Sequence, residues 1–185
     1  MSAVAGTLIA IDGVNGVAVE ATARGLVKEH RGRKSAVSGW DASGIFGELM
    51  VAEEEAGLPS ARTLILLYAA DLAFRLRWEV KPALEQGRLI VVAPYVNTAI
   101  AFGRAAGLDA KSLVEMFAFA PTPDKTLIIE SAGSRSLSDR TGFVEFAVDQ
   151  LLGARSKAVR RELIIRAART LKTISVVTEK GKTPT

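Results

Sequence analysis

The sequence predicts a three-layer α/β/α fold in which helices cover both faces of a five-stranded parallel sheet. Short apolar runs alternate along the chain with longer segments of helical period, which is the pattern of a parallel sheet whose strands are joined by helices. Most of these runs are apolar throughout, as expected of strands that are buried on both faces. The chain has 185 residues, 49% of them hydrophobic, which suits a single globular domain over residues 1–179.

Five segments have the composition of strands. Four of them are near-continuous apolar runs suited to burial on both faces: Thr7–Asp12, Leu89–Ala93, Thr126–Glu130 and Ile174–Thr178. A weaker candidate, Ser35–Ser38, is expected beside the first strand.

Seven segments have the period of helices. They are Val19–His30, Ile45–Glu55, Ala61–Glu85, Val96–Ala106, Ala110–Ala118, Gly142–Leu152 and Lys157–Thr170. In the third segment, apolar residues surround much of the helix, which is more than packing against a sheet requires. A second buried face is therefore expected on Ala61–Glu85, whereas residues 180–185 are expected to form a frayed tail.

The composition argues against several classes of site and partner. There is no cysteine, so neither a disulfide framework nor a thiolate metal site is expected, and the single histidine, His30, lies in a polar run typical of a solvated helix end. No apolar stretch approaches the ~20 residues that span a bilayer, and the amino terminus lacks the charged region of a secretory signal. We therefore expect a cytoplasmic protein without a membrane partner and without a bound metal.

The net charge of +4 is modest. It comes largely from residues 28–34 and 155–172. A solvated helix face explains these cations better than a nucleic-acid-binding surface does.

The segment after the first predicted strand has the outline of a phosphate-binding loop but lacks the residues that hold a phosphate. Such a loop has the pattern G-x-x-x-x-G-K-[ST], in which backbone amides, the lysine and the hydroxyl bind phosphates and magnesium. Counting from Gly13, the second glycine is replaced by Ala18, the lysine by Val19 and the hydroxyl by Glu20. A plain strand–turn–helix connection would account for these residues equally well. The remnant of the loop comprises Gly13, Asn15, Gly16, Ala18, Val19 and Glu20.

Glu20 has an electrostatic consequence of its own. A carboxylate in the first turn of a helix is stabilised by the positive end of the helix dipole, which is the place where a phosphate would otherwise bind. The protein is therefore expected to fill part of its own anion site with Glu20.

Residues 66–109 resemble the central part of bacterial thymidylate kinases. The family pattern there runs approximately L-[FY]-A-A-D-R, then K-P-A-L-x-x-G, a buried strand and D-R-Y; its most specific match in this chain is Lys81–Gly87. Two further matches are the segment IAIDGVNG, which begins at Ile9, and Gly44–Leu49. The resemblance covers Thr7–Glu130 and implies the P-loop NTPase fold of these kinases.

Most of the residues that carry the family's chemistry are replaced. The aspartate and arginine of D-R-Y correspond to Ala93 and Pro94, while Tyr95 is retained. The arginine that binds the acceptor phosphate corresponds to Leu72, and Arg75, about one helical turn further on, is a candidate to compensate for it.

Two other family motifs differ as well. The acidic residue of the loop motif G-x-[DE]-G is Asn15 here, and the family's R-E-P corresponds to Gly39, Trp40 and Asp41. The family's arginine-bearing lid corresponds to a short segment at residues 134–142. Its Arg135 and Arg140 would act either as lid arginines or as ordinary loop and helix-cap charges.

These replacements favour a catalytically inactive, thymidylate-kinase-like protein that binds a nucleoside or nucleotide or regulates a partner. No cofactor is then expected. Candidates for lining the acceptor pocket are Trp40, Leu72, Phe74, Arg75, Tyr95 and Phe102.

The alternative is an active nucleoside monophosphate kinase that converts dTMP to dTDP with Mg-ATP and uses compensating arginines: Arg75, Arg135 and Arg140. By resemblance to the family, a homodimer through Ala61–Glu85 is expected. A mixed dimer with an active kinase is a third hypothesis.

Overall fold

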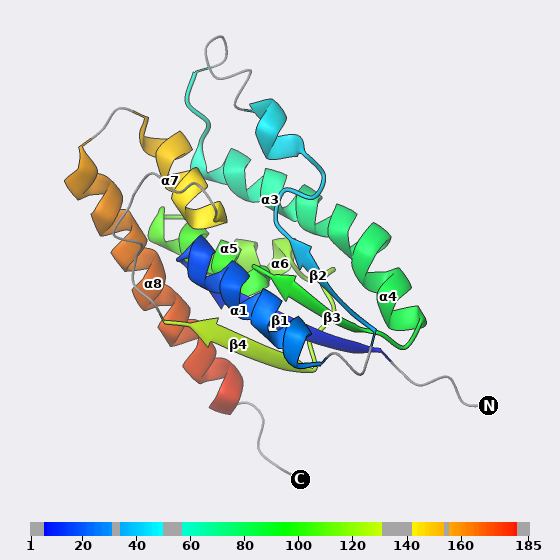
Figure 1. Cartoon of the computed structure of the whole chain (residues 1–185). Coiled ribbons are helices and arrows are strands. Elements are labelled where there is room, and N and C mark those ends of the chain that lie inside the picture. Colours follow the sequence, from blue (N-terminus) through cyan, green and yellow to red (C-terminus); the bar gives the residue numbers. More distant parts are fainter. Residues whose placement is uncertain (1–5, 31–33, 50–56, 131–141, 154–155, 181–185) are drawn as a thin grey trace.

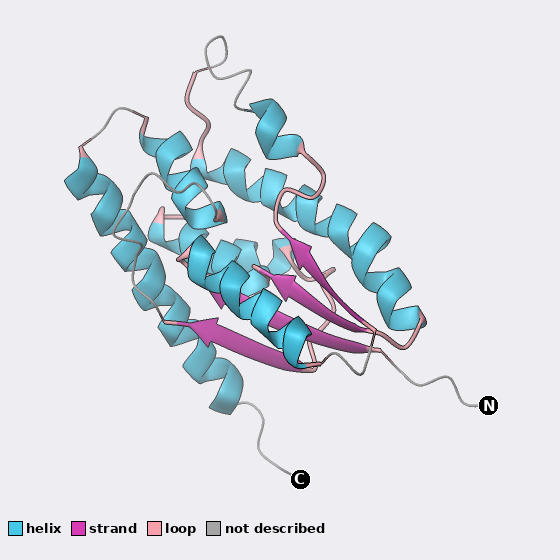
Figure 2. Cartoon of the chain, viewed as in Figure 1, coloured by secondary structure: helices cyan, strands magenta, loops and turns pink. Residues whose placement is uncertain are grey.

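The computed structural model describes residues 6–30, 34–49, 57–130, 142–153 and 156–180, with side chains to residue 174. These residues form an α/β fold in which helices pack on both faces of a parallel sheet (Figures 1 and 2). The predicted fold class is thereby confirmed. No helix among the described residues is long and apolar enough to cross a membrane.

The sheet has four described strands in the order β2-β3-β1-β4, and every neighbouring pair is parallel. The strands are β1 (Thr7–Gly13), β2 (Ser35–Gly39), β3 (Leu89–Ala93) and β4 (Lys125–Ile129). β3 lies between β1 and β2, so the expectation that the second strand would lie beside the first was wrong. β4 is an edge strand and is not buried on both faces as predicted, since its first two residues are exposed.

The fifth predicted strand, Ile174–Thr178, is also wrong, because these residues continue the last helix, α8 (Lys157–Lys180). The segment is rich in β-branched residues, which misled the prediction. No turn signal separates it from the helical residues before it, and adding a residue to an existing helix costs much less than starting a new element.

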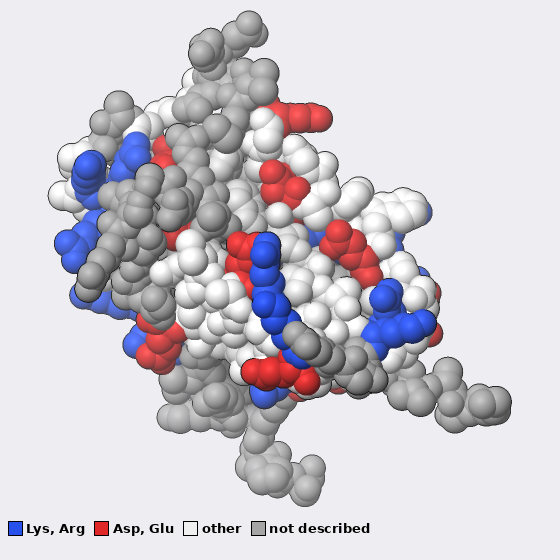
Figure 3. All heavy atoms as spheres, viewed as in Figure 1, with Lys and Arg blue, Asp and Glu red and all other residues white. Residues whose placement is uncertain are grey.

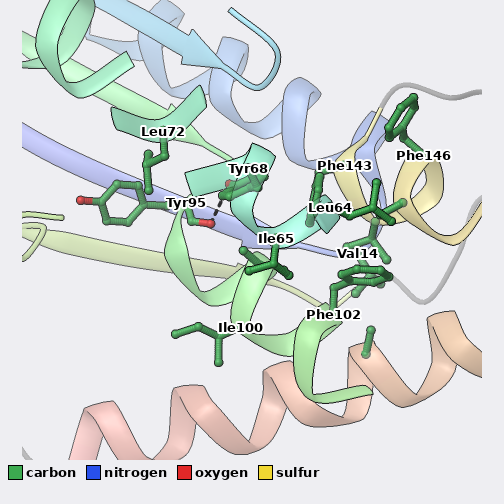
Figure 4. Close-up of a cluster of buried hydrophobic side chains, with 14 of the residues drawn as sticks. Val14, Leu64, Ile65, Tyr68, Leu72, Tyr95, Ile100, Phe102, Phe143 and Phe146 are labelled. Carbon is green, nitrogen blue, oxygen red and sulfur yellow. Dashed lines mark hydrogen bonds between the residues drawn. The ribbon is translucent and has the colours of Figure 1, made fainter. Parts of the chain in front are cut away.

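The two faces of the sheet are covered differently. Helix α1 (Gly16–Glu29) packs on the face formed by Ile9, Ile11 and Val91. The opposite face contributes Leu8, Ala10 and Val92 to a larger core shared with the remaining helices. That core includes the side chains labelled in Figure 4. The helices on this side are α3 (Ala61–Arg75), α5 (Val96–Ala105), α6 (Ala110–Met116), α7 (Phe143–Leu152) and α8.

The predicted long helix Ala61–Glu85 is continuous but changes pitch in the middle. α3 runs into a π-helical turn, Leu76–Val80, and then into α4 (Lys81–Glu85). Pro82 has no amide to donate to the carbonyl four residues earlier, and the amide of Lys81 bonds the carbonyl of Leu76, five residues back. The proline thus coincides with a local change in the hydrogen-bond pattern and does not end the helix.

The predicted helix Ile45–Glu55 begins at Ile45 as expected and is helical to residue 49. Its remaining residues lie outside the described part of the chain.

Candidate functional site

In the loop between β1 and α1, two amides at the start of the helix are hydrogen-bonded to side chains of the protein. Asn15 caps α1, because its side-chain oxygen accepts a hydrogen bond from the amide of Ala18 at 3.1 Å. The amide of Gly16 donates to a carboxylate oxygen of Glu145 at 3.1 Å. Glu145 lies in the first turn of α7, so α7 supplies an anion to the amino-terminal end of α1.

Gly142 shows how closely α7 approaches this loop. A Cβ atom at Gly142 would lie 2.6 Å from the Cα of Gly16 and 2.9 Å from its amide nitrogen. Since such contacts are too short for any side chain, only glycine fits at this position. The start of α7 therefore lies directly against the start of α1.

Glu20 does not have the position that was expected of it. Its carboxylate pairs with Arg24 one turn later on α1, and both side chains are largely exposed. The carboxylate at the helix end belongs to Glu145, which is 129 residues from Gly16 in the sequence. Glu145 was not among the predicted site residues; its place in the first turn of a predicted helix was the one signal that pointed to it.

Asp12, at the end of β1, ties the sheet to the start of α5. One oxygen of its carboxylate accepts hydrogen bonds from the amides of Tyr95 and Thr98, both at 2.9 Å, and from the Thr98 hydroxyl at 2.7 Å. Burial raises the pKa of the Asp12 carboxyl above its usual value, although these hydrogen bonds act in the opposite direction. The anion-binding end of α5 is thus also occupied by a side chain of the protein.

Arg75 is buried in an internal ion pair and is not a surface residue. Its Nε lies 3.0 Å from an oxygen of Asp71, and neither side chain is exposed to solvent. Its guanidinium also donates to the carbonyl of Pro94 at 3.0 Å and lies over the ring of Tyr68. Because these contacts hold the guanidinium inside the protein, Arg75 is not free to replace the missing acceptor-binding arginine.

The other partner of the ion pair, Asp71, holds the loop that follows β2. It accepts hydrogen bonds from the amides of Asp41 at 3.1 Å and Ser43 at 3.0 Å, and from the Ser43 hydroxyl at 2.9 Å. Asp41 has a φ of 57°, an uncommon backbone conformation for a residue other than glycine. The side chain of Asp41 in turn accepts from the amide of Phe46 at 2.9 Å and stabilises the start of the next helix.

A cavity of about 400 Å³ lies where β1, β2 and β3 end. Ligands of open α/β sheets bind at this edge, where connections from neighbouring strands leave in opposite directions. The cavity is bordered by the ends of three strands, by α1 and by the start of α7. Its lining residues are Gly13, Val14, Gly16, Val19, Glu20, Arg24, Val37, Gly39, Trp40, Ala93, Pro94, Gly142, Phe143 and Val144.

The cavity brings together most of the positions at which the family's chemical groups were expected. Among them are Val19 and Glu20 of the phosphate loop, Trp40 after β2, and Ala93 and Pro94 after β3. These positions therefore lie around one cavity, with Val19 and Pro94 where the family pattern has a lysine and an arginine.

The predicted acceptor-pocket residues do not all lie together. Trp40 lines the cavity, whereas Leu72 and Phe102 are fully buried in the core, as Figure 4 shows. Tyr95 is also buried, and its hydroxyl donates to the carbonyl of Pro121 at 2.7 Å. Phe74 is 39% exposed on the outer side of α3. Arg135 and Arg140 lie outside the described residues.

The charges around the site show no separate cation or metal centre. Among the described residues, no group of three or more potential His, Cys, Asp or Glu ligands lies together. On the face of the molecule in Figure 3, basic and acidic side chains are interspersed. That face therefore has mixed charge.

Comparisons with known proteins identify relatives of the chain. No family model matches it. A thymidylate kinase from Xanthomonas oryzae pv. oryzae (strain PXO99A) is 31% identical over 127 residues, which are 68% of this chain and 56% of the relative. A probable thymidylate kinase from Thermococcus gammatolerans is 28% identical over 136 residues, which are 68% of this chain and 65% of the relative. The chain thus matches little more than half the length of the Xanthomonas relative.

A solved structure extends the likeness in fold. The crystal structure of thymidylate kinase from Ehrlichia chaffeensis matches with a TM-score of 0.65 and 14% sequence identity, over 95% of this chain and 89% of that chain. The similarity of fold therefore continues beyond the segment in which the sequences can be aligned with the curated relatives.

Proposed function

The chain is a thymidylate-kinase-like protein in sequence and fold, and we propose that it has lost phosphoryl transfer and works by binding a nucleoside or nucleotide or by regulating a partner. The relatives carry the name thymidylate kinase. The proposal that this chain differs from them in activity comes from the chemistry of its own site.

The hydrogen bond from the Gly16 amide to Glu145 carries the proposal. In a phosphate-binding loop, the amides at the start of the helix hold the phosphate. Here a carboxylate of the same chain takes one of these amides and places negative charge beside the position that the phosphate would occupy. Both effects disfavour the binding of a nucleoside triphosphate.

The missing side chains support the same conclusion. Phosphoryl transfer is catalysed almost entirely by positioning and charge neutralisation. Val19, Glu20 and Ala93 replace a lysine, a hydroxyl and an aspartate. If each loss costs about 2–3 kcal/mol, three independent losses total about 6–9 kcal/mol, or roughly four to seven orders of magnitude in rate.

An active kinase with compensating arginines is the competing function. Arg75 does not favour it, because its guanidinium is committed to Asp71 and Pro94. The remaining candidates are Arg135 and Arg140, and the activity assay below decides between the two functions.

The outer side of the long helix supports a role in partner binding. Leu66, Phe74 and Trp78 are 50%, 39% and 61% exposed there. Large apolar side chains gathered on one exposed helix face commonly mark an interaction surface. We accordingly propose a homodimer through Ala61–Glu85, or a mixed dimer of the same geometry with an active relative.

Calorimetric titration with Mg-ATP and, separately, with dTMP, together with a coupled phosphoryl-transfer assay, tests the loss of activity. The expected result is no turnover and no measurable Mg-ATP binding. Micromolar affinity for Mg-ATP with turnover would contradict the proposal and make Arg135 and Arg140 the next residues to change.

A further inference from the structure

We propose that the cavity at the carboxyl ends of β1, β2 and β3 binds an uncharged planar ring compound and discriminates against its phosphorylated form. This inference rests on the proposed loss of phosphoryl transfer and adds the class of ligand that the altered site accepts. Four features of the cavity carry it: its lining, its aromatic wall, the support of its walls and its charge.

The lining is apolar where a nucleotide site would be cationic. Val14, Val19, Val37 and Val144 contribute aliphatic surface, and glycines expose little more than backbone. The described lining residues that carry charge are Glu20 and Arg24, and these two are paired with each other. Among the residues that the structure describes, a ligand in this cavity therefore meets apolar surface and a neutralised ion pair.

Aromatic side chains form one wall of the cavity. The ring of Trp40 lies 6.3 Å from the ring of Phe143, and both residues line the cavity. Behind them, Phe46 and Phe146 lie 5.3 Å and 5.5 Å from Trp40. The wall is thus backed by a packed aromatic cluster, and aromatic surfaces of this kind favour a planar ring.

The walls are held in place before any ligand binds. Asp71 fixes the amides of Asp41 and Ser43, next to Trp40, while its ion-pair partner Arg75 fixes the carbonyl of Pro94 on another side of the cavity. A single buried ion pair on α3 therefore supports two separate walls. Such preorganisation lowers the cost of ordering a site upon binding.

Charge excludes a phosphate from the same space. The Gly16 amide is already bound to Glu145, and the positive charge of Arg24 in the lining is paired with Glu20. A phosphate would meet the Glu145 carboxylate at this amide and would find no lysine at position 19. The volume of about 400 Å³ lies within the range of about 300–1,000 Å³ that is usual for small-molecule sites.

Tryptophan fluorescence provides a direct test. The chain has two tryptophans, Trp40 and the exposed Trp78, so a Trp78→Phe background leaves Trp40 as the reporter. The probes are thymidine, dTMP and 5′-amino-5′-deoxythymidine, which share one ring and sugar and differ in charge, and benzyl alcohol as a second uncharged ring. The expected result is saturable quenching by thymidine and benzyl alcohol, with at least tenfold weaker binding of dTMP.

A cavity-filling variant shows where the probes bind. Gly39 lines the cavity, and a Cβ atom there would meet no atom within 4 Å, so Gly39→Leu extends into open space without a clash at Cβ. Gly39→Leu should weaken thymidine binding at least tenfold. Gly25→Leu is the matched control, because Gly25 has equally free space but does not line the cavity.

Three results would overturn the inference: no saturable quenching by either uncharged probe, binding of dTMP or of the amino analogue at least as tight as that of thymidine, or quenching that Gly39→Leu does not weaken. The coupled assay on the same protein separates this failure from failure of the proposed function. Turnover would refute the proposed loss of activity, whereas any of these three results without turnover refutes the ligand class alone.

Discussion

Three carboxylates hold backbone amides along the edge of the sheet where ligands of this fold bind. Asp12 accepts a hydrogen bond from an amide at the start of α5, and Asp71 accepts one from an amide of the loop after β2. Glu145 accepts one from an amide at the start of α1. Each of them satisfies backbone N–H groups with a side chain of the protein itself. At the Gly16 amide, this happens at the start of a helix, where a phosphate-binding loop would hold its phosphate.

Asp12 should make the stability of the protein depend on pH. Because burial raises its pKa, the folded state holds the Asp12 proton more tightly than the unfolded state does. The contribution of Asp12 to the free energy of unfolding is therefore largest below the usual aspartate pKa of about 4 and declines as the pH rises through the folded-state pKa. In Asp12→Asn this titration is absent, while the side-chain oxygen that accepts the hydrogen bonds is kept.

Urea unfolding of both proteins between about pH 4 and pH 8 measures the effect. The free energy of unfolding of Asp12→Asn, relative to the natural protein, should increase as the pH rises. A difference that stays constant over this range would show that Asp12 does not titrate differently in the folded and unfolded states.

The Asp71–Arg75 pair should be much more sensitive to mutation than the Glu20–Arg24 pair. Asp71→Ala leaves a fully buried guanidinium without its counter-ion and frees the loop after β2, which should cost about 3–5 kcal/mol of unfolding free energy. Glu20→Ala breaks an exposed pair on α1 and should cost at most about 1 kcal/mol.

Denaturant unfolding of the two variants checks this difference. Adding Arg75→Met to Asp71→Ala should recover part of the lost stability, since it removes the stranded charge. Equal losses for Asp71→Ala and Glu20→Ala would refute the structural role of the buried pair.

Among the secondary-structure elements, the contact between α1 and α7 determines what the phosphate-loop remnant can do. Gly142 and Glu145 bring the amino-terminal ends of both helices together, and the Glu145 carboxylate lies between their positive ends. The change from a phosphate site to a closed contact therefore involves a second element as well as the loop itself. Restoring the loop residues alone would therefore restore phosphate binding only in part, because Glu145 would still hold the Gly16 amide.

Reversion of the loop tests this dependence. Ala18→Gly, Val19→Lys and Glu20→Ser together should restore part of the affinity for Mg-ATP, and adding Glu145→Gln should raise that affinity at least tenfold further. The physical reason is that the glutamine has no negative charge to oppose the phosphate at the Gly16 amide. Calorimetry on the triple variant, the quadruple variant and Glu145→Gln alone measures the two steps, and no gain from the fourth change would argue against the role of Glu145.

For the molecule as a whole, the oligomeric state is the property that can be tested most directly. The outer side of the long helix presents Leu66, Phe74 and Trp78 to solvent, although the sequence predicted a second buried face on this segment. Burial of that face against a second chain would reconcile the pattern with the structure. The sequence prediction and the exposed side chains therefore lead to the same proposal of a dimer.

Sedimentation equilibrium tests the dimer. The natural protein is expected to sediment as a dimer, and Phe74→Glu combined with Trp78→Glu as a monomer, because two carboxylates at the interface would lose their hydration without gaining partners. Val114→Glu is the matched control, since Val114 is 59% exposed on a different helix, α6. A natural protein that remains monomeric at micromolar concentrations would refute the homodimer.

The sequence by itself determined the class of fold, the helices and four of the strands, and the replacement of the phosphate-loop lysine. These features follow from local pattern: apolar runs between helical periods, the match at Lys81–Gly87, and the side chain present at each motif position. The strand at Ile174–Thr178 was wrong because β-branched composition does not reveal that a helix already extends into the segment.

Only the tertiary structure decided which side chains meet at the edge of the sheet. Glu145 reaches Gly16 across 129 residues, Asp12 reaches Thr98 across 86, and Arg75 turns inward to Asp71 and Pro94. These contacts depend on strand order and helix packing, which bring together residues that no local pattern relates. For the same reason, Trp40 lines the cavity while Leu72 and Phe102 belong to the core.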